Sequence, residues 1–474
     1  MLQVQSVDAI VIGSGPNGLA AAIELARAGL QVRLYEANQT IGGGARSGEL
    51  TLPGFTHDLC SAVHPLAAGS PYFSRLPLQD YGLEFIQPAK ALAHPFDDGT
   101  SATLDRSLET TSQGLGRDRV AYRDLIKPFV DDWETLANDL LGPPRFPRHP
   151  FSAARFGLHA IRSAKGFAES KFCEEKTRAL FAGLAAHSFL SLDRLATAAF
   201  GLVLGLLAHV HGWPIAKGGS QSISNALAAY FRDLGGEIVT NHRVESLSEA
   251  PQVKAILCDV TPRQFLKIAG ESLPLGFRRK LGRYKYGPAA FKIDWALSEP
   301  VPWKSSECSK AATIHLGGSF SEIIASEQLA ASGQHAEKPF IILSQPTLFD
   351  PSRAPAGKHI LWGYCHVPNG SKVDMTLRIE KQIERFAPGF RDCILARSVS
   401  TPALLEQHNA NLIGGDINGG SQHLAQMFTR PTARLYSTPV KGLYLCSAST
   451  PPGGGVHGLC GYHAARVALR KSFG

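Results

Sequence analysis

The sequence lacks the cysteine spacings that mark redox and metal sites. Its eight cysteines include no CxxC pair and show no metal-ligand spacing, which disfavours a disulfide-exchanging enzyme and predicts no bound metal. Thiols dispersed in this way are typical of proteins in a reducing compartment. We therefore expect free cysteines and a cytoplasmic protein.

Long apolar runs and long polar tracts are also missing. The longest apolar run, 195–208, is shorter than the roughly 20 residues that cross a bilayer. Residues 1–7 have no basic stretch of the kind that opens a signal peptide. With 44% hydrophobic and 19% charged residues, the composition disfavours a disordered or coiled-coil chain. We expect a globular protein that is soluble or peripheral at a membrane.

A strong excess of one charge is absent as well. Lys and Arg minus Asp and Glu is 48 − 40 = +8 over 474 residues, and this mild balance does not by itself imply nucleic acid. Two basic clusters, 278–285 and 145–171, are the most positive stretches, and the second is interleaved with Phe. They leave peripheral membrane contact open, with solvated surface as the alternative.

Three segments share the pattern of strand, glycine turn and helix. Residues 7–47 predict a strand, a glycine turn, an Ala/Leu-rich helix and a second strand ending at Glu36, which is a βαβ unit. Residues 217–247 predict a helix and a strand at 238–240, and residues 441–472 predict a strand followed by a helix from about 462. These segments are expected to form one discontinuous, doubly wound α/β domain.

The first turn carries the spacing of a dinucleotide site. Gly13, Gly15 and Gly18 form GxGxxG between a strand and a helix, where they permit a tight turn, close approach of a pyrophosphate and close helix packing. The helix N-terminus attracts the phosphate charge. Glu36 stands where a carboxylate can accept hydrogen bonds from ribose hydroxyls. This spacing leaves the choice between NAD and FAD open.

A second glycine doublet and the C-terminal segment carry a family resemblance. Gly42 and Gly43, followed by Arg46, resemble the second glycine doublet of FAD enzymes in the phytoene desaturase and amine oxidase superfamily. The segment 442–465 is similar to the closing motif of that family, in which a Gly/Pro turn covers the flavin ring. The resemblance implies that Gly454, Gly455, Val456 and His457 run past the flavin, that Arg46 lies near the diphosphate, and that the backbone of Val244 meets the adenine.

The resemblance extends over nearly the whole chain. It is closest to the phytoene-desaturase-like carotenoid and retinoid oxidoreductases, in the branch that contains pyridine nucleotide-disulfide oxidoreductase domain-containing protein 2. It implies an FAD-binding domain from residues 1–65, 211–262 and 437–474, and a second α+β substrate domain from 66–210 and 263–436. The partner implied is a small apolar, isoprenoid-like substrate, with homo-oligomer formation left open.

Catalytic residues are harder to predict, because flavin geometry does most of the chemistry in such enzymes. His457 and His64 can carry protons near neutral pH or serve packing alone. Tyr364, His366 and Asp416 lie on segments rich in Gly or Pro, where both functional loops and plain turns occur. The apolar run 195–208 fits a tunnel wall or plain core.

The expected function is hydride exchange between an apolar substrate and FAD. Three alternatives stay open at this point: an amine oxidase on the same fold, a prenyl carrier that binds no flavin, and a flavoprotein with a structural or regulatory role. The three alternatives differ in their flavin. Amines would reduce the flavin of an amine oxidase, a prenyl carrier would contain no flavin, and no substrate would reduce the flavin of a structural or regulatory protein.

Overall fold

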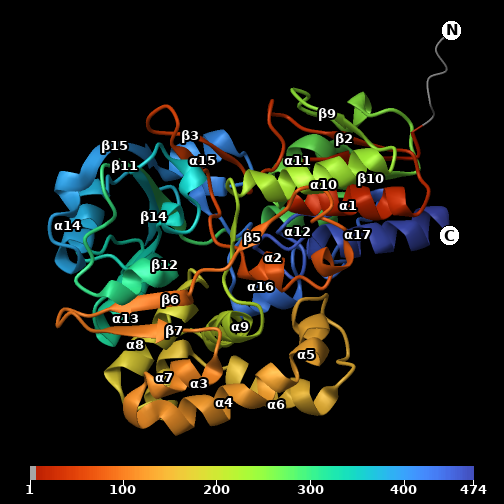
Figure 1. Cartoon of the computed structure of the whole chain (residues 1–474). Helices are drawn as coiled ribbons and strands as arrows, with labels where there is room; N and C mark the ends of the chain where they lie inside the picture. The colour runs from red at the N-terminus through yellow and green to blue at the C-terminus, as the bar shows by residue number, and fades with distance from the viewer. Residues whose placement is uncertain (1–6) are drawn as a thin grey trace.

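The computed structural model describes residues 7–474, which form two main sheets surrounded by helices (Figure 1). One sheet has five strands in the order β16-β10-β1-β2-β9, and all its neighbouring strands are parallel. Its strands are β1 (Ala9–Ile12), β2 (Val32–Tyr35), β9 (Glu237–Val239), β10 (Ala255–Cys258) and β16 (Leu443–Leu445). The predicted parallel sheet, built from segments far apart in the sequence, is confirmed.

Helices cover both faces of this sheet because all four residues of its central strand, β1, are apolar and successive side chains point to opposite faces. Val11 belongs to the large core cluster and Ile10 to a separate one on the other face. The first face is covered by α1 (Pro16–Arg27), α10 (Gln221–Asp233) and α17 (Leu459–Ala468), and the second by α11 (Pro262–Ala269) and α12 (Leu275–Gly282). Helix α17 starts at Leu459, earlier than predicted, because Gly458 turns the chain with a φ of 68°.

The other sheet has seven strands in the order β15-β11-β14-β13-β12-β6-β7. It is mixed, because β12 and β6 pair in parallel while the other neighbours are antiparallel. Its strands are β6 (Lys90–Pro95), β7 (Ser101–Leu104), β11 (Ala289–Leu297), β12 (Ala311–Leu316), β13 (Ile341–Ser344), β14 (His359–Val367) and β15 (Ile394–Ser400).

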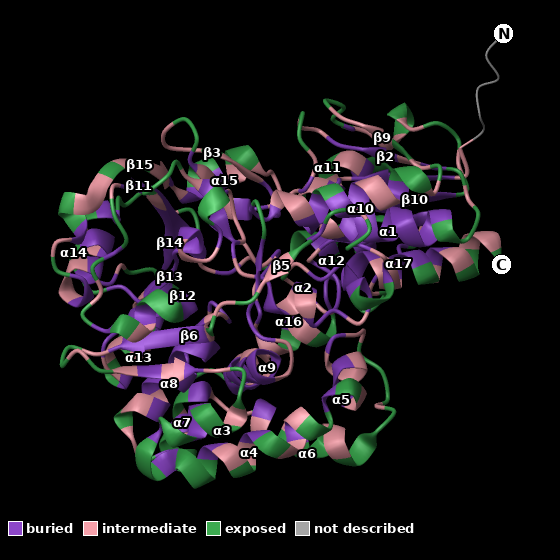
Figure 2. Cartoon of the chain, viewed as in Figure 1, coloured by how far each residue is buried: buried purple, intermediate pink, exposed green. Residues whose placement is uncertain are grey.

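A layer of helices lies below both sheets in the view of Figure 1. It contains α3 (Leu108–Gln113), α4 (Arg119–Asp131), α5 (Trp133–Leu140), α6 (Pro150–Ala160), α7 (Ala164–Lys171), α8 (Glu175–Ala186) and α9 (Thr197–Val210). Figure 2 shows α9 largely buried, whereas α4 and α6 expose much of their surface. The apolar run at 195–208 therefore forms an interior helix.

Smaller elements complete the chain. Two short antiparallel ladders pair β3 (Ser47–Glu49) with β4 (Thr56–Asp58) and β5 (Phe85–Ile86) with β8 (Ile215–Ala216). The remaining α-helices are α2 (Pro65–Ala68), α13 (Phe320–Ala331), α14 (Thr376–Phe386), α15 (Pro402–His408) and α16 (Leu424–Phe428). No helix within residues 7–474 is both long enough and apolar enough to cross a membrane. The proposed domain boundaries stay a prediction.

Candidate functional site

One cavity brings together residues from the beginning, middle and end of the chain. Its volume is about 920 Å³, within the range of about 300–1,000 Å³ typical of small-molecule sites. Gly15, Gly43 and Gly455 all line it. It opens at the carboxyl ends of the parallel strands, where Asp259 follows β10 and Ser447 follows β16. This edge is where open α/β sheets bind their ligands.

The first glycine turn is built by close backbone contacts. Gly13 has a φ of 101°, and a Cβ on Gly18 would lie 1.9 Å from the Gly13 carbonyl oxygen, so both positions require glycine. A Cβ on Gly15 would lie 2.7 Å from Oδ2 of Asp259 and 4.0 Å from Cα of Gly43. Gly15 and Gly43 therefore form a cradle of bare backbone at the start of α1.

Asp259 is a cavity residue that the sequence analysis missed. Its Oδ2 accepts a hydrogen bond from the Gly18 N–H at 2.9 Å, so the carboxyl group sits at the N-terminus of α1. Burial raises the pKa of Asp259 to about 7, and the nearby charge of Glu36 acts in the same direction. Its position directly after a buried strand, and before a Thr-Pro pair, was the available signal.

Glu36 lines the cavity and is tied to the glycine turn. Its Oε2 accepts hydrogen bonds from the N–H and the hydroxyl of Ser14, at 3.0 and 2.5 Å. Its Oε1 accepts from the backbone and side-chain N–H groups of Asn38, each at 2.8 Å. Val244 lines the same cavity. The predicted ribose and adenine contacts of these two residues stay predictions.

Three of the predicted cofactor-binding residues do not line the cavity: Arg46, Gly18 and Gly42. The Arg46 guanidinium donates to the carbonyl oxygens of Gly43 and His408, each at 2.9 Å, and is buried. It therefore supports the second glycine turn from outside the set of cavity-lining residues. Its predicted proximity to a diphosphate stays a prediction.

The C-terminal turn lines the cavity through all four residues from Gly454 to His457. In His457, Nδ1 accepts from the Leu459 N–H at 3.0 Å and Nε2 contacts the Gly453 carbonyl oxygen at 3.2 Å. Burial lowers its pKa to about 4. With both ring nitrogens bonded to backbone, the geometry gives His457 a role in holding the turn.

The other catalytic candidates divide into two groups. His64 and Tyr364 line the cavity, whereas His366 and Asp416 do not. His366 Nδ1 lies 2.6 Å from a carboxylate oxygen of Glu327, in the interior. Asp416 accepts from the N–H groups of Gly287 and Asn418, at 2.8 and 2.7 Å, as a turn residue does.

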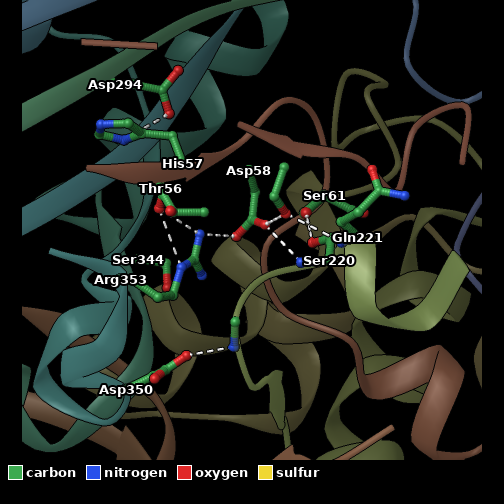
Figure 3. Close-up of polar contacts among 12 residues, drawn as sticks. Thr56, His57, Asp58, Ser61, Ser220, Gln221, Asp294, Ser344, Asp350 and Arg353 are labelled. Carbon is green, nitrogen blue, oxygen red and sulfur yellow. Dashed lines mark hydrogen bonds and ion pairs between the residues drawn. The ribbon is translucent and has the colours of Figure 1, made fainter. Parts of the chain in front are cut away.

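A buried ion pair between Asp58 and Arg353 (Figure 3) is linked to His64 through Ser220. Asp58 accepts from Nη2 of Arg353 at 2.8 Å and from the Ser220 N–H at 2.8 Å. Burial would raise the pKa of Asp58, but the charge of Arg353 and these donors hold it below its usual range. Ser220 Oγ in turn contacts His64 Nε2 at 2.9 Å. The ion pair therefore positions a cavity residue from behind.

Another part of the cavity wall is largely apolar and comes from the helical layer, the segment after α9 and the seven-stranded sheet. We call these residues the apolar part: Leu140, Leu141, Phe156, His187, Ala199, Phe200, Val203, Leu204, Trp213, Thr313, Ile342, Trp362 and Tyr364. Helix α9 thus serves as both core and cavity wall. The charged lining residues are Glu36, Arg243, Glu245, Asp259 and Lys267, which come from loops that follow strands of the five-stranded sheet and from α11.

Comparison with known proteins places the chain among oxidoreductases. Residues 11–76 match the family model of the NAD(P)-binding Rossmann-like domain. Pyridine nucleotide-disulfide oxidoreductase domain-containing protein 2 of Mus musculus is 27% identical, over 98% of this chain and 93% of that protein. The neurosporene-forming phytoene desaturase of Rhodobacter capsulatus is 25% identical, over 96% and 92%.

A solved structure supports the same fold. An oxidoreductase from Methanosarcina mazei superposes with a TM-score of 0.66 at 17% identity, covering 98% of this chain and all of that one. Together the matches support an oxidoreductase with a Rossmann-like dinucleotide-binding segment. The chain is therefore a relative, over almost its whole length, of the phytoene-desaturase-like oxidoreductases, as its sequence motifs indicated.

Proposed function

We propose that this protein is an FAD-dependent oxidoreductase that exchanges hydride between an apolar, isoprenoid-like substrate and the flavin. The observation that carries the proposal is a single cavity that joins three glycine turns to an apolar wall. The glycine turns suit a dinucleotide, and the apolar part suits a substrate with little polar surface.

The bare backbone of the glycine turns leaves room for the diphosphate of FAD. A side chain at Gly15 or Gly43 would fill the gap between them, because each approaches the other without a Cβ. Helix α1 begins at this point with no acidic residue in its own first turn. Asp259 accepts the Gly18 N–H, and the rest of the helix N-terminus can attract phosphate. Gly15 and Gly43 would hold the diphosphate, Glu36 the ribose, and residues 454–457 the ring.

The chain's own residues supply binding, orientation and exclusion of water. The bound flavin would supply the hydride chemistry. Phe156, Trp213 and Trp362 remove water from the space beside the glycine turns, which favours hydride exchange over side reactions. The backbone of 454–457 would orient the ring, and His457 keeps that backbone in place.

The absence of charge in the apolar part disfavours the amine-oxidase alternative. No Asp, Glu, Lys or Arg occurs among its residues, and burial lowers the pKa of its histidine, His187, to about 3. An ammonium group would lose its hydration there without gaining an anionic partner. An uncharged substrate incurs no such cost.

The test is an anaerobic reduction screen of the natively purified protein. Polyenes, retinoids, amines and short-chain alcohols are added in turn, and flavin absorbance is followed. Bleaching by a polyene or retinoid is the expected result. Bleaching by amines alone would establish the amine oxidase, and colourless protein that takes up no added FAD would establish a carrier without flavin.

We also propose that the outer side of α6 rests on an anionic membrane. Phe146, Phe151 and Leu158 are 84%, 91% and 73% exposed, which is unusual for large apolar side chains so close together. Arg148 and Arg155 are exposed beside them, and they match anionic headgroups. We call these five residues the α6 face.

Three residues of the α6 face, Phe151, Arg155 and Leu158, lie on the same helix as part of the cavity wall, and the other two precede it. Phe156 is 3% exposed to solvent and lines the cavity, while Phe151 and Leu158 point outward. Helix α6 therefore lies between the proposed membrane contact and the apolar part. A substrate dissolved in lipid would approach the cavity from this side of the molecule.

A further inference from the structure

Two histidines from different elements meet beside the cavity. His187 follows helix α8 and lines the cavity, and its Nε2 lies 3.0 Å from Nε2 of His315 on strand β12. Thr313, two residues earlier on β12, also lines the cavity. At 3.0 Å one of the two Nε2 atoms must donate a proton and the other must accept it.

The surroundings of His315 determine which ring donates. His315 is fully buried, and its Nδ1 has no hydrogen-bond partner among the described residues. A Cβ on Gly183 would lie 2.5 Å from this Nδ1, so the nitrogen packs directly on the glycine backbone of α8. A buried N–H without an acceptor is rarer in proteins than a buried acceptor without a donor. We therefore assign the proton of His315 to Nε2, from which it is donated to His187.

This assignment determines the chemistry that His187 offers the cavity. Its Nε2 accepts the proton of His315, so its own proton resides on Nδ1 in the neutral ring. Nδ1 makes no hydrogen bond among the described residues. Burial lowers the pKa of both rings, that of His187 to about 3, so the pair stays neutral at physiological pH. The apolar part therefore contains an uncharged imidazole N–H donor, in addition to the indole N–H of Trp362, which also has no partner among the described residues.

We propose that Nδ1–H of His187 binds the oxygen of a carbonyl or hydroxyl group on an otherwise apolar substrate, and that His315 fixes the tautomer required for this contact. The inference rests on the oxidoreductase function proposed above and narrows its substrate class. It predicts a molecule with one terminal oxygen rather than a pure hydrocarbon. The ring of Trp213 packs edge-to-face on that of His187, with the two centroids 6.0 Å apart.

The experiment compares ligands of one carbon skeleton that differ in the oxygen. Calorimetry measures binding of farnesal and of farnesene, its hydrocarbon counterpart, to the holoprotein. We expect farnesal to bind about tenfold more tightly, as one hydrogen bond to an otherwise unpaired buried donor allows. Replacing His187 with Phe should abolish this preference, so that farnesal and farnesene bind with equal affinity.

Two further variants keep the test decisive. His187→Gln retains an N–H donor and should keep part of the preference, and it covers the case in which the Phe variant does not fold. His359→Phe is the matched control, because His359 is the first residue of β14 and does not line the cavity. This variant should leave the preference for farnesal unchanged. Equal binding of both ligands by the unmodified protein, or an unchanged preference in His187→Phe, would overturn the assignment.

Flavin content and anaerobic flavin reduction are measured on the same samples. A preference for farnesal that depends on His187, in a protein whose flavin no substrate reduces, would refute the proposed reaction and leave the binding site standing. Flavin reduction by apolar substrates without any such preference would refute the binding site alone.

Discussion

Replacement of Gly15 with Ala tests the dinucleotide cradle with a single methyl group. The backbone of Gly15 has a φ of −63° and a ψ of 168°, which an alanine adopts without strain. The new Cβ would lie 2.7 Å from Oδ2 of Asp259, well inside the separation of about 3.5 Å that non-bonded heavy atoms prefer. Asp259 must move, and its hydrogen bond with the Gly18 N–H at 2.9 Å would be strained or lost.

The expected change in FAD affinity follows from the crowding that the added methyl group causes. Overpacking by one methyl group costs about 1–3 kcal/mol, and the methyl group stands where the diphosphate would approach. Because about 1.4 kcal/mol corresponds to a tenfold change in affinity, the dissociation constant for FAD should rise by roughly five- to hundredfold. The contact with Asp259 also exists without FAD, so the protein without FAD should lose about 1–3 kcal/mol of its free energy of unfolding.

The assay titrates FAD into flavin-depleted protein and follows flavin fluorescence, with thermal unfolding of the same samples. Gly276→Ala is the matched control, because a Cβ at that helical position would meet no atom within 4 Å. Its affinity for FAD should equal that of the unmodified protein. An unchanged affinity in Gly15→Ala would refute the cradle, and equal losses in both variants would show that the effect is not local.

Three other perturbations have expected outcomes. Above its pKa of about 7 the ionised Asp259 repels a diphosphate, so FAD should bind about tenfold more tightly at about pH 6 than at about pH 8. Asp259→Asn should remove this pH dependence. A flat pH profile of FAD affinity in the unmodified protein would contradict the prediction. Asp58→Ala leaves Arg353 buried without its anion and should lower the free energy of unfolding by about 3–5 kcal/mol in denaturant titrations, whereas replacing both residues by apolar ones should recover most of it. Phe151→Ser should weaken sedimentation with vesicles that contain anionic phospholipid, and binding to neutral vesicles alone would argue against the charge contribution.

The glycine turns and the strands beside them could be predicted because local chemistry determines them. The turn directly after β1 needs a residue at position 13 that accepts a φ of 101°, and Gly18 must lack a Cβ to approach this turn. These requirements leave a fixed spacing in the sequence. The parallel sheet followed from the same pattern, repeated at the middle and the end of the chain.

Side chains that meet across long stretches of sequence could not be predicted. His187 and His315 are separated by 128 positions, and their contact depends on how α8 packs on the seven-stranded sheet. Asp259 reaches the first glycine turn only because β10 lies next to β1. His366, by contrast, lies on a segment that suggested a functional loop, yet it faces the interior as part of a nine-residue strand.

The order of strands in the parallel sheet has a consequence for biosynthesis. Strand β1 is synthesised more than two hundred residues before its neighbour β10, and β16 and α17 follow later still. Helix α1 packs against α17, so α1 cannot complete its packing until residues 459–468 have been synthesised. A nascent chain therefore cannot close the groove proposed for a dinucleotide before these later elements have emerged, and any capture of a cofactor would follow their synthesis.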